Sequence, residues 1–268
     1  MLISIGSESN GRLRLVRKLQ SSKGRSDEGC FTVEGINLVS EVIGRGLDIA
    51  FIMVAEGWLD DERDIRRSAV RECAESGRIT VCEVPEALFN KVTDAEFGAG
   101  VLAVVRKHEA DPGIIDELSE ESNILVLDRI QDPGNMGTMI RTAVAAGYSL
   151  ILAAKGTVDI YSPKVLRATA GMLFEIPVIY TSDAAEMADM LKRSGKRAVV
   201  TVPDGGRPYY EEDLSRGIAL IIGNEGRGVC GEMMSLAKTR VTLPMKGNIE
   251  SLNAAIAAAI LMYEAVRK

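Results

Sequence analysis

Histidine is almost absent from this chain of 268 residues, in which His108 is the single one. Histidine is the usual general base and metal ligand near neutral pH. Its scarcity argues against a Ser-His-Asp hydrolase, a His-ligated metalloenzyme and a His-based nuclease. His108 lies in a charged stretch and belongs to no motif, so any chemistry must depend on other groups.

Closely spaced cysteines and long apolar runs are also missing. The four cysteines, Cys30, Cys73, Cys82 and Cys230, show no C-x-x-C spacing, which argues against a zinc site or a disulfide framework and favours reduced thiols. No segment reaches the roughly 18 uncharged apolar residues of a spanning helix, and no secretion signal is recognisable. The sequence therefore predicts a cytoplasmic protein with neither a bound metal nor a membrane partner.

Positive charge is scarce overall but concentrated at the start of the chain. The net charge is −6, yet residues 1–26 contain six basic residues against the single acid Glu8, which makes this segment +5 and leaves −11 for the rest. A basic arm on an acidic body is expected when one face of a protein meets phosphate, although a solvated helix face would give the same pattern. The basic residues are Arg12, Arg14, Arg17, Lys18, Lys23 and Arg25.

The length favours two unequal domains. An acidic stretch with proline and glycine at 106–122 is typical of a connection, so we predict a domain at 1–107, a linker at 108–121 and a second domain at 122–268. The first domain has the pattern of a small α/β domain. Its expected elements are helices at 38–46 and 62–77 and strands at 49–55 and 101–107.

The second domain contains short apolar, β-branched runs separated by segments of helical character. Such runs indicate strands that are buried on both faces, as in the parallel sheet of an α/β domain. A ligand site is then expected beyond the carboxyl ends of the strands. The runs lie at 123–128, 150–154, 176–180, 197–202, 217–223 and 240–244.

A segment rich in polar residues and glycine, at 127–142, follows the first of these strands. Asp-Pro-Gly-Asn is a turn signature, and Asn135 is predicted to cap the helix that follows. Arg141 lies between Ile140 and Ala143 in sequence, where a buried guanidinium would need an anion or a polar partner. An internal salt bridge remains the alternative.

A glycine-rich loop, IIGNEGRG at 221–228, follows another strand. Its glycines, which include Gly223 and Gly228, allow close backbone approach or a positive φ. The spacing is neither G-x-G-x-x-G nor Walker A. Glu225 would repel a phosphate, so the loop suits a nucleoside without a phosphate chain.

The third polar segment, at 243–253, precedes a C-terminal helix. Ser251 or Asn253 is predicted to cap this helix. Its expected apolar face consists of Leu252, Ile256, Ile260 and Tyr263. The alanine run Ala254–Ala259 is typical of helix-forming sequence and also fits a helix pressed against other segments or a partner subunit.

Taken in order, DPGNMGTMIRTA, IIGNEGRG and LPMKGNIESLN resemble the three signature motifs of the SpoU/TrmH methyltransferases of the SPOUT superfamily. SPKVLRATAG at 162–171 resembles a further family stretch, with Thr169 in place of a usual serine. Arg25 to Gly35 resembles the opening of the family's RNA-recruiting domain. The resemblance therefore extends over nearly the whole chain, although Ala255 stands where a serine is common.

The resemblance implies an α/β protein in which a C-terminal parallel-sheet SPOUT domain carries a trefoil knot, an exception to the rule against knots, and a smaller N-terminal α/β domain binds RNA. It implies S-adenosylmethionine as cofactor and a homodimer whose active sites borrow residues across the interface. The implied catalytic residues are Arg141, Asn135, Glu225, Ser251 and Asn253. The implied cofactor contacts are Thr201, Gly223, Gly228, Leu243, Met245 and Leu252. Lys164 and Arg167 join the basic arm as implied RNA contacts.

The function implied is methyl transfer to a ribose 2′-hydroxyl of structured RNA. The separate N-terminal domain favours ribosomal RNA, with transfer RNA as the alternative. Arginine is a poor proton acceptor, so Arg141 would bind phosphate or stabilise the developing alkoxide, and the proton would pass to water, a phosphate oxygen or a neighbouring group. Two rival hypotheses are a non-catalytic knotted RNA-binding or ribosome-assembly protein and a dinucleotide-dependent oxidoreductase, the latter lacking G-x-G-x-x-G.

Overall fold

The computed structural model describes residues 1–61, 64–93, 100–247 and 251–267. The chain divides into two compact units. Met1–His108 and Tyr161–Leu166 form the first, and Glu109–Ile160 and Arg167–Lys268 form the second. Among the helices in the described ranges, none combines the length and apolar character that a membrane span needs.

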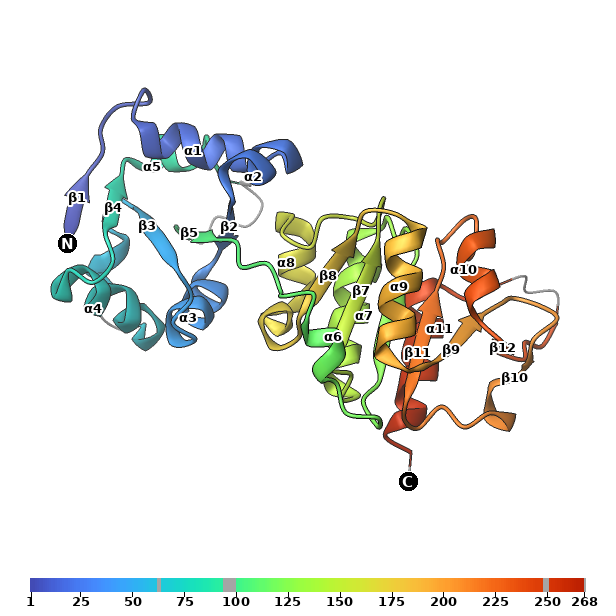
Figure 1. Ribbon diagram of the computed structural model, residues 1–268. Coiled ribbons are helices and arrows are strands. Elements are labelled where there is room, and N and C mark those ends of the chain that lie inside the picture. The colour runs from blue at the N-terminus through green and yellow to red at the C-terminus, as the bar shows by residue number, and fades with distance from the viewer. Residues whose placement is uncertain (62–63, 94–99, 248–250, 268) are drawn as a thin grey trace. The chain divides into compact units, whose positions relative to one another are not determined.

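The first unit is built on a five-stranded mixed sheet in the order β1-β4-β3-β5-β2 (Figure 1). Strand β3 is parallel to β4 and antiparallel to β5. The elements are β1 (Leu2–Ser4), α1 (Gly11–Leu19), α2 (Ser22–Glu28), β2 (Cys30–Glu34), α3 (Ile36–Gly44), β3 (Ile49–Ala55), η1 (Trp58–Asp60), η2 (Ile65–Arg67), α4 (Ser68–Ser76), β4 (Val81–Val84), α5 (Glu86–Phe89) and β5 (Val101–Arg106).

The predicted elements of this unit are confirmed where the structure describes them. The strands expected at 49–55 and 101–107 are β3 and β5, and the helix expected at 38–46 is α3. The helix expected at 62–77 is η2 followed by α4, and its first two residues, 62 and 63, lie outside the described residues. Strands β1, β2 and β4 were not predicted.

The second unit contains a seven-stranded sheet in the order β10-β12-β9-β11-β6-β7-β8. Every pair of neighbours is parallel, as predicted. From the start of this unit to the C-terminus, the elements in chain order are α6 (Ile114–Glu117), β6 (Ile124–Leu127), α7 (Pro133–Ala145), β7 (Leu150–Ala154), α8 (Pro163–Thr169), η4 (Met172–Glu175), β8 (Val178–Thr181), α9 (Ala184–Ser194), β9 (Arg197–Thr201), β10 (Arg207–Pro208), η5 (Tyr209–Glu211), β11 (Ile218–Ile222), α10 (Gly231–Leu236), β12 (Thr239–Thr242), α11 (Ala254–Met262) and η6 (Tyr263–Ala265).

Helices cover both faces of this sheet (Figure 1). Ile124 and Val126 of β6 belong to a core that also contains residues of α6, α9 and α10. Because side chains alternate along a strand, Leu125 and Leu127 face the opposite side, where α11 packs against α7 and β11. Residues 108–121, predicted as a linker, therefore include a helix of the second unit, since Ile115 of α6 is only 1% exposed.

All strands of this sheet end at the same edge because they are parallel. The loops that follow β6, β9, β11 and β12 leave from that edge, and they carry the polar segments singled out in the sequence. The last strand, β12, lies between β10 and β9, which both precede it in the chain. From β12 the chain returns to form α11 against α7.

Candidate active site

Three side chains from the three polar segments are joined by hydrogen bonds at the carboxyl edge of the sheet. Asn135 Nδ2 donates to Glu225 Oε1 at 3.1 Å. Asn253 Nδ2 donates to Asn135 Oδ1 at 2.9 Å. The structure thus brings together residues that lie more than a hundred positions apart in the sequence.

The helix termini at this cluster differ in part from the prediction. Asp132, not Asn135, caps α7: its Oδ1 accepts from Asn135 N at 2.7 Å, and Pro133 occupies the first turn, where its missing N–H costs nothing. The side chain of Asn135 is therefore available for Glu225 and Asn253. Asn253 does cap α11, because its Oδ1 accepts from Ala255 N and Ile256 N.

Glu225 is held by the loop that follows β6. Its carboxylate accepts from Gln131 N at 3.2 Å and from Asp132 N at 3.1 Å, in addition to Asn135 Nδ2. Burial alone would raise the pKa of Glu225, but these hydrogen bonds outweigh it and hold the pKa below its ordinary value. The carboxylate therefore remains ionised and joins the loop that follows β11 to the loop that follows β6.

The loop after β11 turns sharply back on itself. A Cβ on Gly223 would lie 2.3 Å from Val229 N, and Gly228 has a φ of +65°, so both positions favour glycine. Asn224 closes the loop by accepting from Gly226 N and Arg227 N while donating to Arg129 O. The positive φ predicted for this loop is present at Gly228, whereas the close approach at Gly223 is to the loop's own backbone and the predicted approach to a ligand stays a prediction.

A buried carboxylate fixes the base of the same two loops. Asp128, directly after β6, is 1% exposed. Its Oδ1 accepts from Arg129 Nε at 2.8 Å, and its Oδ2 accepts from Cys230 N at 2.7 Å. Arg129 adopts a φ of +58°, which is uncommon for a residue with a side chain. The Asp128 contacts therefore hold a strained turn next to the cluster.

A cavity of about 450 Å³ lies between the loops that follow β9 and β12. Predicted cofactor residues Leu243 and Met245 line it. Thr201, at the end of β9, does not line it, and its Oγ1 donates to Ile221 O. Volumes of this order are typical of small-molecule sites. The other lining residues, which include Asp204, were not predicted: they are Pro203, Asp204, Gly206, Pro208, Thr242 and Pro244.

Comparison with known proteins follows the same division of the chain. The profile described as "SpoU rRNA Methylase family" matches residues 122–263, and that of the "MRM3-like substrate binding domain" matches residues 10–103. The chain is 34% identical to the 23S rRNA (guanosine(2553)-2'-O)-methyltransferase RlmP of Bacillus subtilis, over 97% of each protein. The chain belongs to the SpoU rRNA methylase family.

Solved SpoU structures resemble this chain over both units. The S-adenosylmethionine-bound rRNA methyltransferase from Sinorhizobium meliloti superimposes with a TM-score of 0.84 and 28% identity, covering 99% of this chain and 98% of that one. The SpoU methyltransferase AviRb from Streptomyces viridochromogenes, in complex with the same cofactor, gives a TM-score of 0.82 and 28% identity, covering 96% and 98%. The fold of this SpoU protein is therefore that of complete two-domain relatives.

Arg141 of this SpoU protein does not join the cluster formed by Asn135. It is exposed, whereas its apolar sequence neighbours had led us to expect a buried guanidinium. It has no hydrogen bond or ion pair to any described residue. Six residues separate it from Asn135, which places the two about 120° apart around α7. The neighbours Ile140 and Ala143 are buried because they lie on other sides of the helix.

The basic arm is exposed except for Arg25, which is buried, and Arg12, which is partly buried. Arg25 is 3% exposed, and its Nη1 donates to Leu19 O and Gln20 O at the end of α1. Its prediction as an RNA contact was therefore wrong, since the guanidinium supports the fold. Arg14, Arg17, Lys18, Lys23 and Lys164 are exposed, while Arg12 and Arg167 are partly buried.

The start of α11 is only partly described. Asn248, Ile249 and Glu250 of the third motif lie outside the described residues. Ser251 and Leu252 are exposed, and no hydrogen bond places Ser251 in the cluster. Asp132 and Asn224 act in the site but were missed in the sequence. The Asp-Pro pair was a usable signal for Asp132, whereas nothing in the sequence alone reveals that Asn224 closes its loop.

The lowered pKa of Glu225 predicts a pH-dependent contribution to stability. Because its folded pKa lies below the ordinary 4.5, the contribution is fully present above pH 4.5 and is lost as the pH falls through the folded pKa. Wild type should therefore unfold at a higher urea concentration than Glu225→Gln at pH 7, with the difference shrinking below pH 4.5. Urea titrations from pH 7 to pH 3 measure this difference.

The control for this experiment is Glu211→Gln, which changes an exposed glutamate of η5 that has no hydrogen-bond partner among the described side chains. Its unfolding midpoint should follow that of wild type at every pH. An equal, pH-independent decrease in the urea midpoint of both variants would contradict a specific role for the Glu225 hydrogen bonds.

Proposed function

We propose that this protein transfers a methyl group from S-adenosylmethionine to a ribose 2′-hydroxyl of ribosomal RNA. The observation that carries the proposal is the hydrogen-bonded cluster of Asn135, Glu225 and Asn253, which joins all three motif segments of a SpoU methylase. The third of these segments also supplies Leu243 and Met245 to a ligand-sized cavity. The relatives named above support both the reaction and the class of RNA.

The cavity that Leu243 and Met245 line fits the methyl donor. Leu243, Met245 and the loop at 203–206 form its wall, and Asp204 supplies a carboxylate for a cationic ligand. S-adenosylmethionine, when bound, supplies an electrophilic methyl group on a sulfonium. The protein's part is to hold that group with loop backbone and to exclude water, which Gly223 and Gly228 allow by keeping the neighbouring loop tight.

Arg141 acts on the RNA and not on the donor. A guanidinium keeps its proton in proteins, so it serves as a hydrogen-bond donor to a backbone phosphate or to the oxygen that gains negative charge as the methyl group is transferred. The hydroxyl proton passes to water, a phosphate oxygen or a neighbouring group.

Arg141 reaches an active site through dimerisation. It points away from the cluster of its own chain, which matches a site completed by Arg141 of the partner subunit. Apolar side chains before, on and after α11 are exposed: Leu252 by 39%, Ile256 by 51%, Tyr263 by 51% and Val266 by 48%. A protein monomer rarely leaves such a row uncovered. The apolar face predicted for α11 thus lies mainly on the outside, and a second copy of this chain covers it.

The C-terminal segment of the second unit forms a trefoil knot. The placement of β12 between β10 and β9, followed by return of the chain to α11 on another part of the sheet, supports this topology. Knots are rare in proteins. Here the loops that cross one another are the loops that hold the cavity.

The first unit recruits the RNA. Its exposed basic residues on α1 and α2 supply the phosphate contacts, with Lys164 and Arg167 contributing from α8. The protein acts in the cytoplasm, where reduced thiols persist. All four of its cysteines are free.

The test is incubation of purified protein with methyl-labelled S-adenosylmethionine and unmodified transcripts of 23S rRNA, 16S rRNA and a transfer RNA pool, followed by nucleoside digestion. Label in a 2′-O-methylnucleoside from one ribosomal RNA is the expected result. Label only in transfer RNA would show that transfer RNA, and not ribosomal RNA, is the substrate. Label on a base would refute transfer to the ribose. Donor binding without transfer would favour the non-catalytic alternative.

A further inference from the structure

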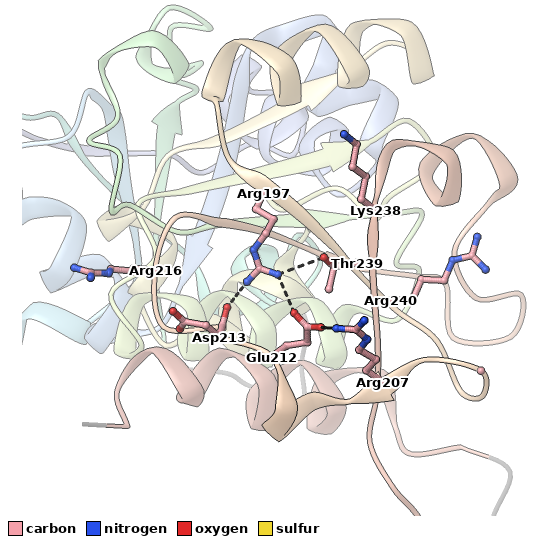
Figure 2. Close-up of a pocket in the computed structure, with 9 residues that line it drawn as sticks. Arg197, Arg207, Glu212, Asp213, Arg216, Lys238, Thr239 and Arg240 are labelled. Atoms are coloured by element: carbon pink, nitrogen blue, oxygen red, sulfur yellow. Dashed lines mark hydrogen bonds and ion pairs between the residues drawn. The ribbon is translucent and has the colours of Figure 1, made fainter.

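A second hollow in the second unit, distinct from the candidate active site, is strongly basic (Figure 2). It has a volume of about 660 Å³ and lies at the amino ends of β9 and β12, where Arg197 and Thr239 begin these strands. Five cations and two carboxylates line it, a net charge of +3 in a chain of net charge −6. The cations are Arg197, Arg207, Arg216, Lys238 and Arg240.

The centre of the hollow is already neutralised by internal contacts. Arg197 Nη1 lies 3.3 Å from Glu212 Oε2 and 3.3 Å from Thr239 Oγ1, and Arg197 also donates to Asp213 O. Arg207 Nη1 donates to Glu212 Oε1 at 3.0 Å. Figure 2 shows these side chains turned toward one another. Arg197 therefore has a structural role.

The rim, in contrast, carries two cations whose side chains no described protein group uses. The side chains of Lys238 and Arg240 are exposed and make no hydrogen bond or ion pair with any described residue. In Figure 2 both side chains extend away from the central contacts. Arg207 pairs with Glu212 through Nη1, and three quarters of its side chain is exposed. Lys238 and Arg240 are thus free to meet anions from solvent, and the exposed part of Arg207 can add a third contact.

An exposed aromatic residue lies in the same segment. Tyr210 is 57% exposed and lies in the sequence between the lining residues Arg207 and Glu212, with its ring 5.4 Å from that of Tyr209. Proteins bind unpaired stretches of RNA by combining cations for the phosphates with aromatic faces for the bases. A free phosphate would use the cations alone, so the aromatic ring favours RNA as the occupant.

The hollow also adjoins the proposed donor cavity. Gly205 and Arg207 line the hollow, while Gly206 and Pro208 line the cavity. The short strand β10 therefore separates the two, and it pairs with β12 along Val241 and Thr242. RNA bound at the rim would pass beside the donor.

We propose that Arg207, Lys238 and Arg240 bind backbone phosphates of the RNA substrate and that Tyr210 stacks on one of its unpaired bases. This inference rests on the proposed function, because it takes RNA to be the substrate. It adds a contact surface in the methyltransferase unit to the basic arm of the first unit.

The experiment measures affinity for an unmodified 23S rRNA transcript as a function of salt for wild type, Lys238→Ala/Arg240→Ala and Tyr210→Ala. Loss of two phosphate contacts should reduce the slope of log affinity against log salt by roughly 1.4 to 1.8. Loss of the stacking ring should weaken binding by roughly 5- to 100-fold with little change in slope. Binding of S-adenosylmethionine, measured by calorimetry, should equal that of wild type in both variants.

The matched control is Lys192→Ala, which removes an exposed lysine from α9. It is compared with the single variant Lys238→Ala. A wild-type affinity and salt slope in both the double variant and Tyr210→Ala would overturn the inference, as would an equal effect of Lys192→Ala. Failure of wild type to methylate any RNA refutes the proposed function instead, because the comparison of RNA binding does not depend on transfer.

Discussion

Replacement of Arg141 by Ala is expected to lower the rate of methyl transfer about 10²- to 10³-fold, because it removes a preorganised hydrogen-bond donor. Donor affinity should not change, since Arg141 lies outside the cavity that Leu243 and Met245 line. The guanidinium is exposed and has no described partner to lose, so the variant should fold as wild type does.

Single-turnover transfer to rRNA and calorimetric titration of the donor measure these two quantities separately. Arg141→Lys serves as the control: it keeps the charge but loses the planar fork of donors, so its rate should lie between those of wild type and Arg141→Ala. Near-normal transfer by Arg141→Ala would show that another group performs this role.

Mixing two inactive variants tests whether Arg141 acts across the dimer. If Arg141 serves the partner's site, a heterodimer of Arg141→Ala with Glu225→Gln contains one site in which both residues are wild type. If Arg141 serves the site of its own chain, the heterodimer contains no such site. Equal mixing after subunit exchange should then restore about a quarter of wild-type activity. Absence of any recovery, with heterodimers present, would place Arg141 in its own chain's site.

Replacement of Ile256 by Asp is expected to convert the protein to a monomer and to reduce methyl transfer at least as much as Arg141→Ala. The substitution places a charge in the middle of the exposed apolar row on α11, where it would be buried in the dimer. The helix itself should tolerate it, because acidic residues are favoured in the first turn. Light scattering gives the mass, and transfer to rRNA gives the activity.

The control is Ile65→Asp, which charges a side chain of the first unit that is 81% exposed. It should leave both the mass and the activity as in wild type. A dimeric and active Ile256→Asp protein would contradict the proposed use of α11, whereas a monomer with full activity would contradict completion of the site by the partner subunit.

Local sequence was sufficient for the six longer strands of the second sheet, because short β-branched runs between helical segments permit few other structures. It was not sufficient for β10, since Arg207 and Pro208 form a strand only by pairing with β12. Recognition of the three motifs correctly indicated the family, and it marked Asn135, Glu225 and Asn253 before their contacts were known.

The predictions of side-chain burial were wrong where burial depends on which side of a helix faces the core. Arg141 was expected to be buried because its sequence neighbours are apolar, but successive residues point about 100° apart around a helix. The sequence of α11 is apolar on nearly every side, so its composition did not reveal that Ala255, Ala258, Leu261 and Met262 would be buried while Ile256 is exposed. Asn135 was mistaken for the cap because α7 begins one turn earlier than predicted, so that Asp132 is the cap and accepts from Asn135 N.

The sequence by itself determined the family, the parallel sheet and the residue types available for chemistry, because these depend on patterns within short segments. Only the tertiary structure decided that Glu225 would be fastened by Gln131, Asp132 and Asn135, that Arg25 would be used internally, and that Lys238 and Arg240 would share a rim. The Glu225 contacts depend on which distant segments the sheet brings to the same edge, and the burial of Arg25 depends on how α2 packs against the end of α1.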